Sequence, residues 1–251
     1  MSPRGVRWLA AALFLVAAAA AAGAQAPSPL VAELAVLARR YHEDPRRLDT
    51  IRDALAREAA EDPHPATLAA LARAWFLWGE IRATSAEAKL EAYDRGREAA
   101  RRALERTPRD AATHFWFAVN TARWGQTKGI VRSLFLLPTV QEEIRTILEL
   151  DPGFTGVYAL AGNVYLEVPR LLGGDLERAE RMFRTGLGQD PRSTGLRVGL
   201  AKTLVKTGRI AEARRELEAV LAERAATNPA DWTMKDVPEA RALLETLRER
   251  S

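Results

Sequence analysis

Three side chains in the middle of the chain could together hold an anion. Trp116, Asn120 and Arg123 stand at positions i, i+4 and i+7 of a segment with helical character, so they would share one helix face. Arg123 and the following Lys128 could then bind a carboxylate or phosphate group. The same pattern suits a structural role, in which the aromatic residues are core and Arg123 snorkels or caps a neighbouring helix.

The sequence offers little else with catalytic character. His42, His64 and His114 are the three histidines, and no two of them share a metal-binding spacing with a third ligand. No nucleophile elbow, phosphate-binding loop or dinucleotide fingerprint is present. We therefore predict no catalytic residue, no cofactor and no metal. The enzymatic alternative would pair His114 with a carboxylate in a deep pocket, whereas a buried and satisfied His114 would argue against it.

Regularly spaced prolines predict the elements that position these residues. Helix-forming residues dominate, and apolar residues recur at intervals of three and four. Prolines follow five of the helical segments, 38 to 45 residues apart, at Pro63, Pro108, Pro152, Pro191 and Pro229. Prolines repeated at such a spacing indicate an array of helix pairs.

The unit that ends at Pro191 carries the most complete repeat pattern. Its small and aromatic positions, Tyr158, Gly162, Tyr165, Ala179 and Phe183, match those of a tetratricopeptide repeat, which is about 34 residues long. Surplus residues are expected between helices, mainly at 125–138 and 169–173. The predicted fold class is therefore all-α: an irregular tetratricopeptide-like α-solenoid with long inter-helix insertions. A solvating cap helix is expected at 237–250.

The repeat pattern also predicts a concave wall. The first helix of each pair would line this surface, and the residue after its small position would point inward. Asn163 and Lys202 occupy such positions, and Arg123 lies one turn beyond another. A polar and partly cationic wall would suit an organic anion or a peptide carboxylate, although an ordinary hydrated surface explains the pattern too.

The N-terminal residues predict export. Arg4 and Arg7 precede the apolar run 8–22, and small residues at Ala22 and Ala24 suit cleavage. We expect a signal peptide at 1–24 and a single helical-repeat domain at 25–251, with no stable membrane span after cleavage. The predicted location is periplasmic or secreted. The chain has no cysteine, which excludes a disulfide framework and an acylated N-terminal cysteine.

Charge patterning argues against nucleic acid as a partner. The formal net charge is +4, but acidic and basic residues alternate, as in Glu177-Arg178 and Arg214-Arg215-Glu216. Such alternation is typical of a solvated helix face, whereas nucleic-acid binding requires a stripe of positive charge.

Residues 110–225 resemble the T-component family of TRAP transporters, which are periplasmic tetratricopeptide-repeat proteins. The resemblance rests on the segments Phe115-Trp116-Phe117, Arg123-Trp124-Gly125, Leu136-Leu137-Pro138, Leu150-Asp151-Pro152 and Pro169 to Phe183. It implies a non-enzymatic accessory that docks a periplasmic solute-binding protein, with a small hydrophobic or anionic ligand and homo-oligomer formation. Family members are often lipoproteins, and the missing cysteine departs from that pattern.

The sequence thus leads to two functional hypotheses besides the enzymatic one. The first is an exported binding or scaffold protein that serves an organic-acid type transporter. The second is a general envelope module for protein–protein interaction without a small ligand. Neighbouring genes for a permease and a solute receptor would favour the first.

Overall fold

The computed structural model describes residues 28–249, and every regular element of this part of the chain is helical. The all-α prediction is therefore confirmed. The expected signal peptide lies outside the described residues and stays a prediction. No helix within 28–249 has the length and apolar character that a membrane crossing requires.

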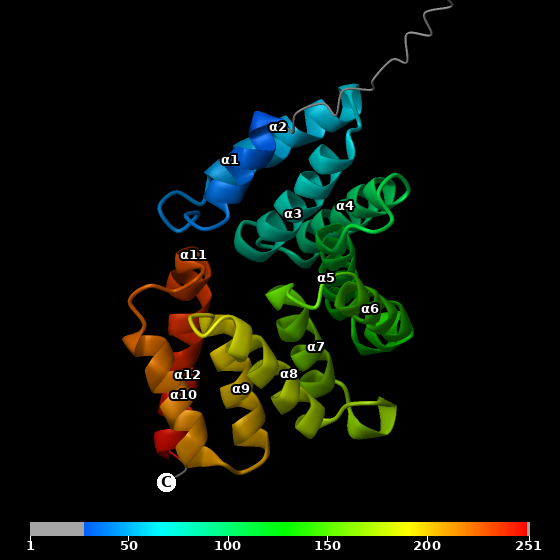
Figure 1. The fold of residues 1–251 in the computed structure, drawn as a ribbon. Coiled ribbons are helices and arrows are strands. Elements are labelled where there is room, and N and C mark those ends of the chain that lie inside the picture. The colour runs from blue at the N-terminus through cyan, green and yellow to red at the C-terminus, as the bar shows by residue number, and fades with distance from the viewer. Residues whose placement is uncertain (1–27, 250–251) are drawn as a thin grey trace, which may run out of the picture.

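Successive helices pack side by side and the array curves round, as Figure 1 shows. The α-helical segments are α1 (Pro29–Leu37), α2 (Arg47–Glu61), α3 (Pro65–Ile81), α4 (Ala86–Leu104), α5 (Ala111–Lys128), α6 (Ile130–Leu150), α7 (Thr155–Glu167), α8 (Leu176–Gln189), α9 (Thr194–Lys206), α10 (Ile210–Ala222), α11 (Pro229–Asp231) and α12 (Val237–Glu249). A 3₁₀ turn, η1 (Arg170–Leu172), follows α7, and a π-helical turn, η2 (Trp232–Asp236), joins α11 to α12.

The five predicted prolines separate consecutive helix pairs. They fall between α2 and α3, α4 and α5, α6 and α7, α8 and α9, and at the start of α11. Proline lacks an N–H and cannot continue a helix, but it is tolerated in a first turn. Helix α12 coincides with the predicted cap helix over the described residues.

A phenylalanine between two glycines fixes the spacing of the α7–α9 layer. Phe183 of α8 is fully buried. A Cβ added to Gly162 of α7 would lie 2.6 Å from the Phe183 ring, and one added to Gly199 of α9 would also collide with it. Gly162 is one of the small positions named by the repeat pattern, whereas Gly199 has the same role without a signal in that pattern.

The prediction that residues 125–138 form an insertion between helices is wrong. Helix α5 continues to Lys128, Gly129 turns the chain with a φ of 111°, and α6 begins at Ile130. Pro138 lies inside α6 and not at the start of a helix. The surplus residues therefore lengthen two helices instead of forming a loop. The surplus at 169–173 does form a turn, η1, which ends at Gly173 with a φ of 101°.

The C-terminal segment closes the curve by packing on the first helices. Ala230 of α11 is fully buried and belongs to the hydrophobic cluster built by α1 to α4. Beside it the Tyr41 hydroxyl, just after α1, donates a hydrogen bond of 2.6 Å to Asp231 Oδ1. Figure 1 shows α11 beside the turn that joins α1 and α2. The array is therefore closed within one chain.

We predict that Gly199→Ala lowers the free energy of unfolding by about 1–3 kcal/mol, because the added methyl group overpacks the fixed Phe183 ring. Gly188→Ala is the matched control, since nothing lies within 4 Å of a Cβ there. Replacing this helical glycine should stabilise the protein by about 0.5–1 kcal/mol. Urea unfolding measures both changes, and equal stabilities of the two variants would contradict the packing account.

Candidate functional site

Glu80 is the centre of a charged network on the inner face of the curve. One carboxylate oxygen, Oε1, accepts a 2.6 Å hydrogen bond from the Tyr93 hydroxyl. The other, Oε2, lies 3.1 Å from an Arg123 nitrogen and 3.9 Å from Lys235 Nζ. Lys235 also lies 3.5 Å from Asp231. The network thus joins α3, α4 and α5 to the closing C-terminal segment.

Arg73 of α3 is partly buried in the same region. Its guanidinium carbon is 5.3 Å from the centre of the Trp116 ring, and its Nε is buried without a hydrogen-bond partner. Burial lowers the pKa of Arg73, while the charge of Asp231 acts in the opposite direction. A desolvated guanidinium over an indole face is an attractive cation–π contact.

The structure places Trp116 and Asn120 in the packing between helices. Trp116 is partly buried and contacts both hydrophobic clusters of the described chain. Asn120 is fully buried, and its amide donates to the carbonyls of Ala72 at 3.2 Å and Trp116 at 2.7 Å. Gly96 leaves room for this amide, because an added Cβ would lie 2.6 Å from the Asn120 side-chain carbon. Asn120 therefore offers no surface to a ligand in this closed form.

The four other predicted binding residues do not converge on one place. Arg123 is held by Glu80 and Gln126, and Lys128 Nζ lies 5.6 Å from the centre of the Trp124 ring. Asn163 is exposed on α7. Lys202 forms a 2.9 Å ion pair with Glu239 of the cap helix. Their binding role stays a prediction, and the cations among them already have partners within the chain.

His114 holds two helices and a turn together. Its Nδ1 lies 2.6 Å from Glu143 Oε2 and its Nε2 lies 3.0 Å from the Pro108 carbonyl. Both side chains of the His114–Glu143 pair are less than 15% exposed. Because both ring nitrogens are satisfied, this arrangement favours the structural interpretation of His114. Within 28–249 no cluster of His, Asp and Glu residues is suited to a metal ion.

An open groove on α3 presents two tryptophans and two arginines. It has a volume of about 370 Å³. Its floor is Trp75 and Trp78 of α3, and its walls come from α2 and α4. The wall residues are Arg52, Asp53, Ala56, Ala88, Glu91 and Arg95. We call this set of eight residues the Arg–Trp groove.

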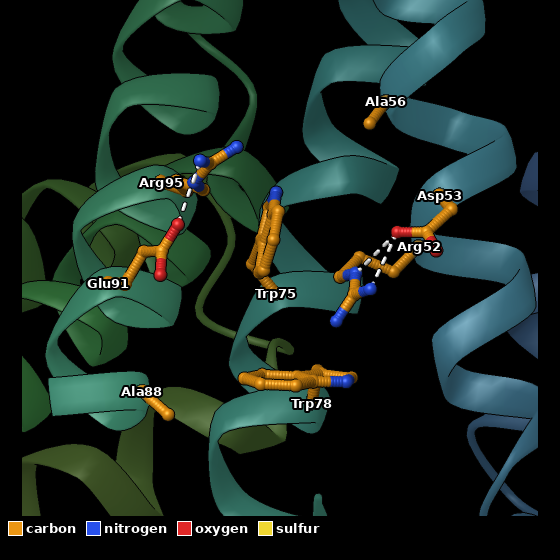
Figure 2. Close-up of a pocket in the computed structure, with 8 residues that line it drawn as sticks. All are labelled: Arg52, Asp53, Ala56, Trp75, Trp78, Ala88, Glu91 and Arg95. Carbon is orange, nitrogen blue, oxygen red and sulfur yellow. Dashed lines mark hydrogen bonds and ion pairs between the residues drawn. The ribbon is translucent and has the colours of Figure 1, made fainter. Parts of the chain in front are cut away.

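Stacking fixes the arginines of the Arg–Trp groove. Figure 2 shows Trp75 between the two arginines, with Trp78 beneath Arg52. The Arg52 guanidinium carbon is 4.7 Å from the centre of Trp75 and 4.6 Å from that of Trp78. Arg95 approaches Trp75 to 5.3 Å. The Arg52 side chain is 14% exposed, so this cation–π contact is partly desolvated and stronger than one in open water.

Ion pairs also orient Arg52 and Arg95 of the Arg–Trp groove. Arg52 donates to Asp53 Oδ1 from Nε at 2.9 Å and from a terminal nitrogen at 2.6 Å, and Arg95 lies 2.8 Å from Glu91. A guanidinium carries five N–H donors, so each arginine retains donors for an incoming carbonyl or carboxylate. Trp75 is only 9% exposed, so the partly exposed Trp78 is the indole that can pack an apolar side chain. This combination is typical of protein-docking hot spots.

Asp49 anchors the Trp78 end of the groove. Its carboxylate accepts hydrogen bonds from Trp78 Nε1 and from Arg82, at 3.0 Å to one Arg82 nitrogen. Partial burial alone would raise the pKa of Asp49, but the bonds from Arg82 and Trp78 outweigh it and lower the pKa below its ordinary value. Asp49 is therefore charged at neutral pH and holds the indole in place.

The Arg–Trp groove was not found by sequence reasoning. Its tryptophans stand at i and i+3 of α3, a spacing that also fits core packing. Arg52 and Arg95 come from two other helices, and only the packing of α2, α3 and α4 brings them to the same indole. The sequence did contain a signal for this groove: two tryptophans in one helix, with arginines in the helices before and after it.

The helix-pair array and its glycine–aromatic packing define the class of the protein as tetratricopeptide-like repeat proteins. A tetratricopeptide-repeat model matches residues 170–233. The model of the family described as "Regulator of microtubule dynamics protein 1-3" matches residues 31–185, which is more than half of the chain, and the protein belongs to that family. No curated protein matches the sequence.

Three solved structures are similar to this chain, and the first of them supports the fold. A thermophilic TPR protein from Thermus thermophilus is similar over 87% of this chain and 97% of its own, with a TM-score of 0.63 and 21% identity. A MamA double mutant matches 78% of this chain and 96% of its own, with a TM-score of 0.47 and 14% identity. A tetratricopeptide-repeat protein from Parabacteroides merdae matches 88% of this chain and 93% of its own, with a TM-score of 0.42 and 13% identity.

The buried carboxyl group of Asp236 makes the stability of the protein depend on pH. Asp236 of η2 is 7% exposed and accepts a 2.6 Å hydrogen bond from Thr194. Desolvation raises its pKa to about 6, against the opposing effect of the Thr194 bond. The folded state therefore binds this proton more tightly than the unfolded state, and its contribution to stability is lost as pH rises from about 4 to about 6.

We expect Asp236→Asn to remove this loss, because asparagine stays neutral and can still accept from Thr194. At pH 8 the variant should be more stable than the wild type by up to about 3 kcal/mol, with the difference disappearing below about pH 4. Urea unfolding at a series of pH values measures the effect. A difference that does not change between these pH values would contradict it.

Proposed function

We propose that this protein is an exported, non-enzymatic scaffold that docks a partner protein in the Arg–Trp groove. Tetratricopeptide-repeat proteins bind protein partners, and this groove is the observation that carries the proposal. It offers aromatic area, guanidinium donors and a fixed geometry in one place, and Trp and Arg are the residue types enriched at interface hot spots. The preferred partner segment carries an apolar side chain next to an acidic residue or an exposed carbonyl.

A more specific proposal concerns the cellular location of the protein and the identity of its partner. The expected signal peptide supports a periplasmic or secreted location, and the resemblance to TRAP T-components supports a solute-binding protein of an organic-acid type transporter as the partner. The family description refers to microtubule dynamics. We carry over from that family the helical scaffold and not a microtubule target, because the expected leader directs the chain out of the cytoplasm.

The second candidate function is an envelope interaction module without a small ligand. Its support is that the cationic residues predicted to hold an anion already pair with the chain itself. Arg123 is held by Glu80 and Lys202 by Glu239. A transporter accessory that also binds solute would have to release these ion pairs first.

Capture from envelope extract tests the docking proposal. The tagged protein should enrich a specific partner, and Arg52→Ala with Trp78→Ala should reduce its recovery about tenfold or more, as expected for hot-spot residues. The matched control is Arg181→Ala, an exposed arginine on α8, which should leave recovery unchanged. Equal capture by the wild type and the double variant, with unchanged helical circular dichroism, would reject the groove as the docking site.

Calorimetric titration with succinate separates the two finer functions. A solute-binding accessory should give a binding isotherm that weakens in Arg123→Ala and Lys202→Ala. The interaction module should give no heat of binding in any of the three proteins. An isotherm that both substitutions leave unchanged would exclude these residues from a solute site.

A further inference from the structure

Apolar side chains project from one part of the surface without a partner in the described chain. Seven large hydrophobic residues of 28–249 are well exposed, and five of them come from two short segments. These five are Ile130, Val131 and Phe135 at the start of α6, and Leu171 and Leu172 of η1. We call them the apolar tip. Soluble proteins rarely gather such residues without an interaction to serve.

The two segments of the apolar tip lie on neighbouring elements. A Cβ added to Gly173, directly after η1, would lie 3.9 Å from Gln141 Nε2 of α6. Gln141 is less than two helical turns from Phe135 along α6. The Gly129 turn, with its φ of 111°, directly precedes Ile130, where α6 begins. The tip is therefore formed by the first turns of α6 and by the short turn η1, and not by one face of a single helix.

The two segments of the apolar tip carry only positive charges, and the nearest acidic residues in sequence flank them at Glu142, Glu167 and Asp175. Lys128, Arg132 and Arg170 lie within its segments, and neither 127–141 nor 168–174 contains an acidic residue. Elsewhere arginines are interleaved with acids, as in the ion pairs along α4. At the tip Lys128 and Arg132 lie instead over the Trp124 ring, at 5.6 and 5.9 Å from its centre. The surroundings are therefore complementary to a negatively charged surface.

We infer that the apolar tip docks the protein on the surface of an anionic lipid bilayer. The exposed fractions decide between a bilayer and a protein partner. Leu171 is 98% exposed, Val131 80% and Phe135 74%, so neighbouring residues cover little of each side chain. Projecting apolar side chains insert readily into the fluid boundary of a bilayer, about 5–10 Å deep, whereas a protein partner would need a matching pit for each one.

The cations of the tip complete the contact. Lysine and arginine near an anionic leaflet add attraction that falls with ionic strength. Trp124 lies beneath Lys128 and Arg132, and tryptophan is favoured at the boundary of water and hydrocarbon. The inference is independent of the Arg–Trp groove, because that groove is formed by α2, α3 and α4 and shares no residue with the tip.

Vesicle flotation tests the inference. We expect the protein to float with phosphatidylcholine vesicles that contain roughly 30% phosphatidylglycerol, and to bind less at high salt. The variant Val131→Ser/Phe135→Ser/Leu171→Ser should bind about tenfold or more weakly, since burial of large apolar side chains is worth at least that factor. Lys128→Glu/Arg132→Glu should lose the preference for anionic vesicles.

The matched control is Val36→Ser/Met234→Ser, which removes two exposed apolar side chains outside the tip. It should float like the wild type. All variants share the same N-terminal residues, so a contribution from that region cancels, and circular dichroism verifies folding. Absent flotation of the wild type, or equal flotation of the tip variant, would overturn the inference. So would a concentration-dependent dimer that the tip variant abolishes, because the tip would then be covered by a second copy.

Discussion

The rest of the structure depends on the contact between the C-terminal segment and the first helices. Ala230 completes the N-terminal hydrophobic cluster, and the Tyr41–Asp231 hydrogen bond joins residues 190 positions apart. Burial raises the pKa of Tyr41, and the charge of Asp231 adds to this, so the phenol stays a donor at physiological pH. Because both ends are held, charged groups pair across the inner face of the array, as Glu80 does with Lys235 of the closing segment.

Closure determines which surfaces remain for function. The face predicted to hold an anion is joined instead to the closing segment through Glu80, Arg123 and Lys235. The Arg–Trp groove and the apolar tip lie on other parts of the array and are open to solvent. A scaffold of this kind would present a protein-docking groove and a membrane-docking tip from separate helices, which allows both contacts at once.

The local part of the fold could be predicted from the sequence, and the non-local part could not. Prolyl turns and the Gly162–Phe183 contact are encoded within one repeat, so their spacing revealed them. The position of Pro138 inside α6 could not be predicted, because a proline fits the first turn of a helix better than its interior. The Tyr41–Asp231 closure has no local signal, and Asn120 was predicted as a binding residue because its burial depends on Gly96 of another helix.

The distance between the two ends of the array tests closure most directly. The chain has no cysteine, so Val36→Cys and Met234→Cys introduce two unique exposed sites for spin labels, one on α1 and one on η2. Double electron–electron resonance should give one narrow distribution centred on the separation in the closed structure. A broad distribution at longer distances, as expected for an open superhelix, would contradict the account.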